Sequence, residues 1–261
     1  MLRNVIILAP KGQQQFALAA LLRAHNPALT FTPVTTPDEV AAIDRGILRQ
    51  SRLVAFASGT IVPRDTLKAL GCGGYNFHPG SLDYPGWAPA HFALYDGAKT
   101  FGATAHLMTE YVDAGPIVGT ETFVIPPGTS LSQLEQITYV RLAYLFWRLA
   151  KQLAHSEPLQ TLPIAWAKNK STRRQYEAMC DIPLGISRHE LERRIYAFDD
   201  SFRGIHPTIT LHGFQFRAVV ATSPAAEPQL DPNSAPVELQ RLAQEMRAMP
   251  EPRTGTFVTN A

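Results

Sequence analysis

NVIILAPKGQQQFALAALLRAH, residues 4–25, contains two adjacent local patterns that together decide the fold class. The apolar run Val5–Ala9 has the length and the β-branched content of a buried strand. It is followed by Gln13–His25, in which Ala, Leu and Gln favour a helix. A buried strand that leads into a helix is typical of βαβ units, in which crossover helices join parallel strands.

The same alternation of strand and helix signals continues along the first half of the chain. We expect strands at Phe31–Val34, Leu53–Ala57 and Tyr75–Phe77, and helices at Pro37–Ile47 and Pro63–Leu70. This order predicts an α/β fold, with a Rossmann-like, mostly parallel sheet and helices on both faces. In such folds functional groups gather in the loops at the carboxyl ends of the strands.

The second half of the chain adds longer elements and then changes in character. We expect a helix at Pro89–Asp96, strands at Gly102–Thr109 and Pro116–Ile125, and a long helix to Ala154 that a capping box of Ser130 and Gln133 begins. A helix capped by Ser187 and a hairpin of Thr208–Leu211 with Phe214–Val220 predict a small α+β extension. Recurrent prolines then indicate a tail, with one helix at Val237–Met249.

The composition excludes several classes of protein. Hydrophobic residues make up 45% of the chain and charged residues 18%, unlike a disordered chain or a coiled coil. The 24 Lys and Arg nearly balance the 22 Asp and Glu, which argues against a dedicated nucleic-acid binder. Cys72 and Cys180 are too few for a zinc site or a disulfide scaffold, so we expect no metal.

Neither a signal peptide nor a transmembrane segment is apparent. Val5–Ala9 is too short for either, and Leu131–Ala154 carries charged residues that lipid would not accept. We therefore expect a cytoplasmic protein without membrane contact.

Basic residues gather between positions 168 and 194: Lys168, Lys170, Arg173, Arg174, Arg188, Arg193 and Arg194. They could bind the phosphates of a nucleotide-linked substrate. A solvated helix face explains them equally well, and residues 168–174 have a composition that suits a loop.

Three polar residues are candidates for chemistry. Asn76 and His78 end a predicted strand and project to the same side of it, where an amide and an imidazole can polarise a carbonyl group and move a proton. Asp113 follows 35 residues after His78, and the intervening helix and strand can return the chain to the same sheet edge. Each residue alone is more typical of a turn or a satisfied polar group than of a catalytic residue. The functional interpretation therefore depends on their combination.

Each of three further side chains near this segment has a structural interpretation as well as a functional one. His106, within a predicted strand, is expected to line a pocket or to pack, and His91 is expected to pack or to lie at the surface. Trp87 follows a Pro-Gly turn and could be a platform for a ligand or a core residue.

The sequence around the candidate residues resembles a known family. The resemblance lies in NFHPGSL at 76–82, YPGWAP at 84–89, GATAH at 102–106 and DAGPI at 113–117. These segments are similar to the catalytic domain of 10-formyltetrahydrofolate-dependent formyltransferases, over roughly residues 3–154. That family includes methionyl-tRNA, glycinamide ribonucleotide, nucleotide-sugar and hydroxyornithine formyltransferases.

The resemblance implies transfer of a formyl group from the co-substrate N10-formyltetrahydrofolate to a primary amine. The family's catalytic Asn, His and Asp fall on Asn76, His78 and Asp113. Asn76 and His78 would donate hydrogen bonds to the tetrahedral oxyanion. Asp113 would orient His78, keep it protonated and accept the proton of the amine.

The resemblance also implies where the folate lies. Its expected contacts are Ser58, Gly59, Thr60, Ile61, Val112 and Asp113. Gly59 has no side chain and would let the backbone approach the ligand closely, although an ordinary strand-to-helix turn explains the same loop.

Departures from the family pattern favour one acceptor class over another. The stretch SLDYPG at 81–86 lacks the Arg of methionyl-tRNA formyltransferases, and the extension is small for a tRNA-binding domain. We therefore expect a small-metabolite amine, foremost an amino sugar on a nucleotide carrier. The alternatives are a methionyl-tRNA formyltransferase, a hydroxyornithine-type or other amine formyltransferase, a formyltetrahydrofolate hydrolase, and a non-catalytic folate or nucleotide binder.

We expect three regions along the chain. They are a catalytic domain at 1–160, a helix and hairpin region at 161–222 and a Pro-rich tail at 223–261. The hairpin and the tail are candidate contacts of a homodimer.

Overall fold

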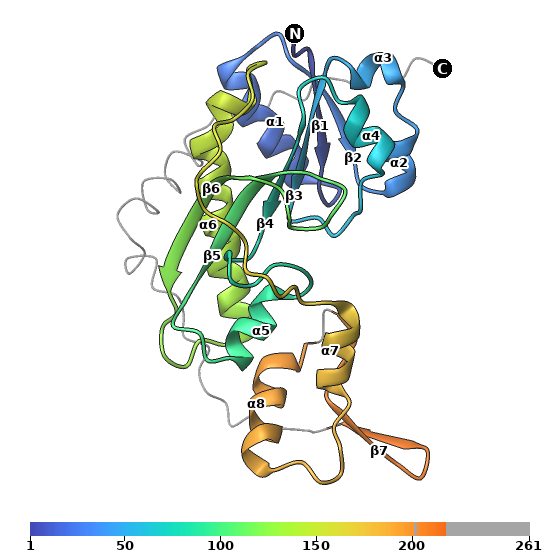
Figure 1. Cartoon of the computed structure of the whole chain (residues 1–261), viewed down its shortest axis with the longest axis vertical. Helices are drawn as coiled ribbons and strands as arrows, with labels where there is room; N and C mark the ends of the chain where they lie inside the picture. Colours follow the sequence, from blue (N-terminus) through green and yellow to red (C-terminus); the bar gives the residue numbers. More distant parts are fainter. Residues whose placement is uncertain (201–202, 218–261) are drawn as a thin grey trace. The chain divides into compact units, whose positions relative to one another are not determined.

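The computed structural model describes residues 1–200 and 203–217, and its centre is a six-stranded sheet in the order β2-β1-β3-β4-β5-β6 (Figure 1). The strands are β1 (Asn4–Leu8), β2 (Thr30–Val34), β3 (Ser51–Phe56), β4 (Gly74–His78), β5 (Thr100–Leu107) and β6 (Ile117–Val124). The first four strands run parallel, whereas β5 is antiparallel to both β4 and β6. The expected α/β class and mostly parallel sheet are confirmed.

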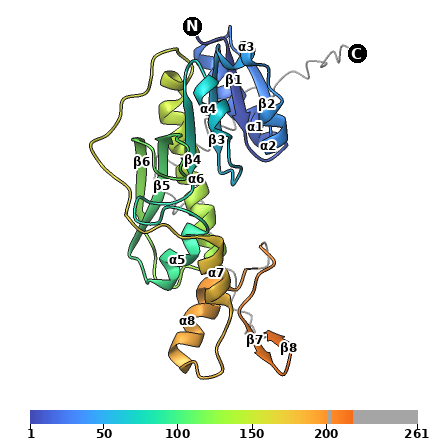
Figure 2. The ribbon, with the colours of Figure 1, turned by 45° about the vertical axis from the view of Figure 1, so that its right-hand side comes forward.

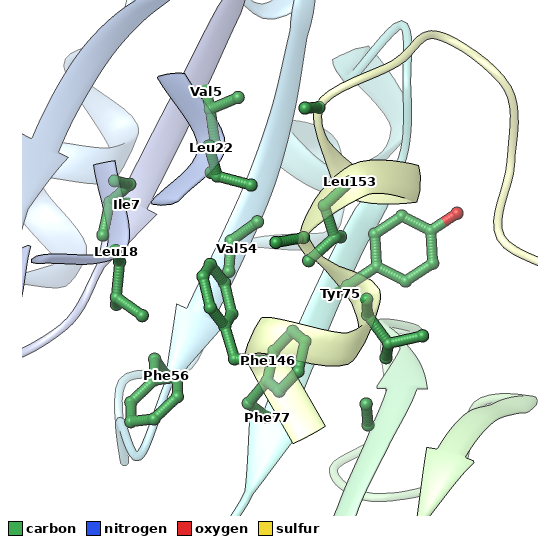
Figure 3. Close-up of a cluster of buried hydrophobic side chains, with 14 of the residues drawn as sticks. Val5, Ile7, Leu18, Leu22, Val54, Phe56, Tyr75, Phe77, Phe146 and Leu153 are labelled. Atoms are coloured by element: carbon green, nitrogen blue, oxygen red, sulfur yellow. The ribbon is translucent and has the colours of Figure 1, made fainter. Parts of the chain in front are cut away.

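Helices cover both faces of this sheet because alternate side chains of each strand point to opposite sides. Val5 and Ile7 of β1 pack with α1 (Gln13–His25) and α6 (Leu131–Leu153), in the core shown in Figure 3. Ile6 and Leu8 pack in a second cluster on the other face. The helices on that side are α2 (Pro37–Ala41), α3 (Arg45–Leu48) and α4 (Arg64–Ala69).

Two expectations about helices are wrong, and both errors involve capping residues. The helix expected over Pro37–Ile47 is two short helices, because the Asp44 carboxylate accepts the N–H groups of Gly46 and Ile47 and begins α3. The stretch expected as loop and basic tract contains α7 (Arg173–Cys180). Thr172 and Gln175 form its capping box, a signal that the sequence contained.

The remaining helices follow their predicted caps. Ser130 and Gln133 form the expected capping box of α6, and the Ser187 hydroxyl accepts the Glu190 N–H at the start of α8 (Arg188–Phe198). Together with α5 (Pro89–Tyr95) and α7, α8 surrounds a third apolar cluster that includes Tyr176 and Phe198.

The expected hairpin is present as β7 (Thr208–Leu211) and β8 (Phe214–Arg217) (Figure 2). The expected end of the hairpin and the whole tail, including the helix at 237–249, lie outside the described residues. The homodimer stays a prediction. Within residues 1–200 and 203–217, no helix combines the length and the apolar character needed to cross a membrane.

His91 on α5 is fully buried and connects α5 to the segment that follows α8. Its Nε2 lies 3.2 Å from Asp200 Oδ2 and 3.3 Å from Arg203 Nη1. Arg203 also lies 3.2 Å from Glu135 and over the Trp87 ring. Burial, reinforced by Arg203, lowers the pKa of His91 to about 4. His91 is therefore neutral at pH 7, and of its two expected roles the structure shows packing.

The buried His91 should make folding sensitive to acid. The unfolded chain takes up this proton near pH 6.5 and the folded chain only near pH 4. The free energy of unfolding therefore falls as the pH drops through this window, by on the order of 2 kcal/mol from His91 alone. We expect His91→Gln to flatten that slope in urea denaturations at several pH values. His189→Gln, at an exposed position on α8, is the control, and an unchanged slope in His91→Gln would contradict the assignment.

Candidate active site

The ends of β4 and β5 bring three of the polar residues together. Asn76 and His106 are register partners across the antiparallel β4–β5 pair, and Asn76 Nδ2 lies 3.1 Å from His106 Nε2. The His106 Nδ1–H donates to the Leu107 carbonyl at 3.0 Å, which holds the ring in place. His78, the last residue of β4, is buried, and its Nε2 lies 3.3 Å from the Tyr84 carbonyl oxygen.

Asp113 lies between the two imidazoles, in the turn from β5 to β6. Its Oδ2 accepts the Gly86 N–H at 2.8 Å and lies 3.4 Å from His78 Nδ1, and its Oδ1 lies 3.2 Å from His106 Nε2. The side chain is 2% exposed, and the residue has φ 41°, a left-handed conformation that Asp tolerates better than most residues. The structure thus places Asn76, His78 and Asp113 around one point, with His106 as a fourth member.

Burial and the neighbouring charged groups act in opposite directions on the pKa values at this point. Burial by itself raises the pKa of the Asp113 carboxyl, but His78, His106 and the Gly86 N–H outweigh it and bring that pKa to about 2. Burial lowers the pKa of His78, and the opposing effect of Asp113 does not compensate for it. Burial therefore opposes the expected effect of Asp113 on the protonation of His78, and that role of Asp113 stays a prediction.

These side chains line a pocket of about 360 Å³. All the residues expected at the folate line the same pocket: Ser58, Gly59, Thr60, Ile61, Val112 and Asp113. It opens where β4 ends, which is the edge at which parallel sheets bind ligands. Its size is that of a small-molecule site.

A larger and more open depression of about 800 Å³ lies at the opposite edge, beside the first residues of β1 and β2. It contains none of the predicted site residues, so the smaller pocket is the better candidate. In the part of the chain that the structure describes, no group of three or more His, Cys, Asp or Glu side chains could hold a metal ion.

Comparison with known proteins identifies the segment that carries this pocket. Residues 39–140 match the family model described as Formyl transferase. This segment belongs to the formyl transferase family. The resemblance to formyltransferases found in the sequence is confirmed for these residues.

A curated relative and solved structures extend the comparison. The methionyl-tRNA formyltransferase of Roseiflexus sp. (strain RS-1) is 35% identical over 133 residues, which is 49% of this chain and 40% of the relative. The chain thus matches less than half the length of that protein. A sugar N-formyltransferase from a Shewanella species superposes with a TM-score of 0.68 at 17% identity, covering 84% of this chain and 97% of that one.

A second solved structure with the same fold is a complex with ligands. It is the N-formyltransferase from Helicobacter canadensis, in complex with folinic acid and dTDP-3-aminofucose. Its TM-score is 0.58 at 14% identity, covering 82% of this chain and 86% of that one. At these identities the two solved structures show the fold of this chain.

The pocket also includes residues that the sequence analysis did not single out for this site. Lys170, Ser171 and Thr172 line it, and Trp166 contacts both of its histidines. All four follow residue 160, where we expect the catalytic domain to end, so the site draws on both segments. Trp166 lies between the apolar run Leu162–Ala165 and the polar residues that begin at Lys168, and no local signal in this stretch indicated a place at the site.

Most of the basic cluster is not directed at the pocket. Arg173 pairs with Glu177, Arg188 with Glu192, and Arg193 and Arg194 with Glu190. These pairs favour a solvated helix face for the four arginines. Lys170, by contrast, lines the pocket and donates a hydrogen bond to the Val112 carbonyl.

Gly80 leaves room for the His78 ring. A Cβ at this position would lie 2.4 Å from His78 Nε2 and 2.9 Å from Pro89 Cβ. We expect Gly80→Ala to displace the imidazole and to lower kcat for formyl transfer by about 100-fold, since misplacement by about 1 Å has that effect. Steady-state kinetics measure it.

Gly185→Ala is the matched control for Gly80→Ala, because a Cβ there meets no atom within 4 Å. Circular dichroism should show both variants folded. A Gly80→Ala protein with the kcat of wild type would mean that the position of His78 does not limit the reaction.

Proposed function

We propose that this protein transfers a formyl group from N10-formyltetrahydrofolate to a primary amine. The observation that carries the proposal is the convergence of Asn76, His78 and Asp113 on one pocket, beside the loop expected at the folate, in a formyl transferase segment. When an amine attacks a formyl carbon, the reaction requires donors for the oxyanion and an acceptor for the amine proton. An amide, an imidazole and a carboxylate supply these groups.

The proposed reaction forms one C–N bond and breaks another. The amine nitrogen attacks the formyl carbon, and hydrogen bonds from Asn76 Nδ2 and His78 Nε2 stabilise the oxyanion. Without substrate, His78 Nε2 faces the Tyr84 carbonyl oxygen at 3.3 Å, and in the proposed reaction it exchanges that acceptor for the oxyanion. Each such donor contributes about 3–4 kcal/mol to the stabilisation of the transition state.

Asp113 is the proposed acceptor of the amine proton. Its low pKa leaves it ionised, and its Oδ1, which lies 3.2 Å from His106 Nε2, keeps a lone pair that can accept a proton. As the bond from the formyl carbon to N10 breaks, the His78–Asp113 pair returns a proton to N10. The products are a formamide and tetrahydrofolate, so the co-substrate is consumed once per turnover.

The proposed acceptor is the amine of a small metabolite, foremost an amino sugar on a nucleotide carrier. Two observations support it: the pocket is small, and a neighbour with the same fold is described with dTDP-3-aminofucose and folinic acid. A methionyl-tRNA acceptor is the second candidate, because the matching curated relatives are methionyl-tRNA formyltransferases.

One assay separates these functions. Purified protein is incubated with N10-formyltetrahydrofolate and with dTDP-linked amino sugars, hydroxyornithine or methionyl-tRNA, and mass spectrometry detects the formylated product. We expect formylation of an amino sugar. Formate release without a formamide would identify a hydrolase, and folate binding without turnover would identify a binder. Either result would contradict the proposal.

The folate loop can be tested apart from the chemistry. In the free protein a Cβ on Gly59 meets no atom within 4 Å, so Gly59→Ala should leave stability unchanged. If the backbone there approaches the co-substrate, we expect the KM for N10-formyltetrahydrofolate to rise about tenfold, as for a lost contact of about 1.4 kcal/mol, with little change in kcat. Equal KM values in Gly59→Ala and wild type would place the folate elsewhere.

A further inference from the structure

We propose that Trp166 is a positioning residue for formyl transfer. Its ring contacts the His78 and His106 rings and holds them in the orientation that the reaction requires. This inference rests on the proposed function for its kinetic consequences. Its geometric basis is independent of that function.

The Trp166 ring contacts both imidazoles edge to face. Its centroid lies 5.7 Å from that of His78, with an interplanar angle of 78°, and 5.2 Å from that of His106, with an angle of 87°. Such T-shaped contacts have a preferred geometry and therefore oppose rotation of the rings. One indole thus restrains two imidazoles that face a single carboxylate, Asp113.

Trp166 does not line the pocket that its two histidine partners line. Asn76, His78 and His106 line the pocket, whereas Trp166 is not among the described residues that line it. Its Nε1–H donates to the Gly115 carbonyl at 3.1 Å, two residues beyond Asp113, which fixes the indole. The ring is therefore a wall behind the imidazoles, with no lining position from which to contact substrate.

Backbone hydrogen bonds hold this wall in place. We call residues 166–171 the strap. At one end the Ala167 N–H donates to Leu82 O at 2.9 Å. At the other end the Ser171 N–H donates to Pro85 O at 3.0 Å, and the Trp87 N–H donates to Ser171 O at 3.0 Å.

The strap also supports the carboxylate. The loop to which it is bonded contains Gly86, whose N–H donates to Asp113 Oδ2. A Cβ on Gly86 would lie 2.2 Å from Ser171 O, so the two backbones are in close contact. One segment therefore supports both imidazoles through Trp166 and the carboxylate through Gly86.

Loss of the indole should change chemistry more than binding. We expect Trp166→Ala to lower kcat about 10- to 100-fold, since small misplacements of reacting groups have effects of that size, with the KM of donor and acceptor nearly unchanged. Trp166→Phe keeps an aromatic ring behind the imidazoles and should restore most of kcat. Trp147→Ala, on the exposed side of α6, is the control.

The pH profile distinguishes positioning from a general loss of structure. Burial holds the pKa of His78 low, and the ionisable groups that face the imidazoles are Asp113 and each other. Water that enters in Trp166→Ala should raise the pKa of His78, so the acid limb of kcat/KM should move to higher pH. A Trp166→Ala enzyme with the kcat and acid limb of wild type would overturn the proposal.

Fluorescence tests the contact without any turnover. Protonated imidazole quenches an indole in contact with it, so the emission that wild type has and Trp166→Phe lacks should fall as His78 protonates, over a titration from about pH 9 to about pH 4. His78→Gln should change that titration. If wild type shows no formyl transfer but this titration appears, the proposed function fails and the contact stands. A difference emission that does not vary with pH would overturn the role of Trp166.

Discussion

Asp113→Asn is expected to lower kcat/KM for formyl transfer by about 10³- to 10⁴-fold while the protein remains folded, as for loss of the carboxylate that orients a catalytic histidine. The substitution keeps the size of the side chain and an oxygen for the Gly86 N–H. It removes the negative charge that lies 3.4 Å from His78 Nδ1 and 3.2 Å from His106 Nε2. Steady-state kinetics with saturating donor, together with a urea denaturation, measure the two effects separately.

Asp38→Asn, at an exposed position in the first turn of α2, is the matched control and should retain the activity of wild type. Activity of Asp113→Asn within about tenfold of wild type would show that another group accepts the amine proton, because a general base contributes at least about 10²-fold. The mechanism given above would then be wrong.

Arg52→Met is expected to have the largest effect on stability, a loss of about 3–5 kcal/mol in the free energy of unfolding. The Arg52 side chain is fully buried within β3 and donates to backbone carbonyl groups at 2.7–3.1 Å. These acceptors are Cys72, Gln152, Leu153, His155 and Glu157. Met fills a similar volume but leaves the carbonyl groups in the interior without donors.

The position of Arg52 adds to the expected loss. Its guanidinium lies at the carboxyl end of α6, where a positive charge is favourable, and over the Tyr75 ring at 5.2 Å. Urea denaturation of wild type, Arg52→Met and the exposed control Arg45→Met measures the difference. A loss of less than about 1 kcal/mol would contradict the account, since one unsatisfied buried acceptor alone costs about that much.

Local signals made several helices and strands predictable. The α1 helix has the expected bounds, and Ser130 and Ser187 begin α6 and α8 as expected. Strand-helix alternation also predicted the sheet and the edge at which the pocket lies. Each of these signals depends on residues within a few positions of one another, so tertiary contacts do not have to be known.

Local sequence patterns also predicted part of the candidate site. Asn76 and His78 share a face because they are two residues apart on β4, which is a local property. The part played by His106 is not local, since it depends on the register that pairs it with Asn76 across β4 and β5. Sequence reasoning could offer only a pocket wall or a packed residue for it.

The sequence by itself therefore determined the α/β class, the caps of the long helices and the polar residues of the formyl transferase segment. Only the tertiary structure decided that Trp166 lies behind the histidines, that Arg52 holds the end of α6, and that His78 loses protons more readily than free histidine. The physical reason is shared by all three. Each depends on burial and on partners brought from distant parts of the chain, and neither leaves a pattern in the neighbouring residues.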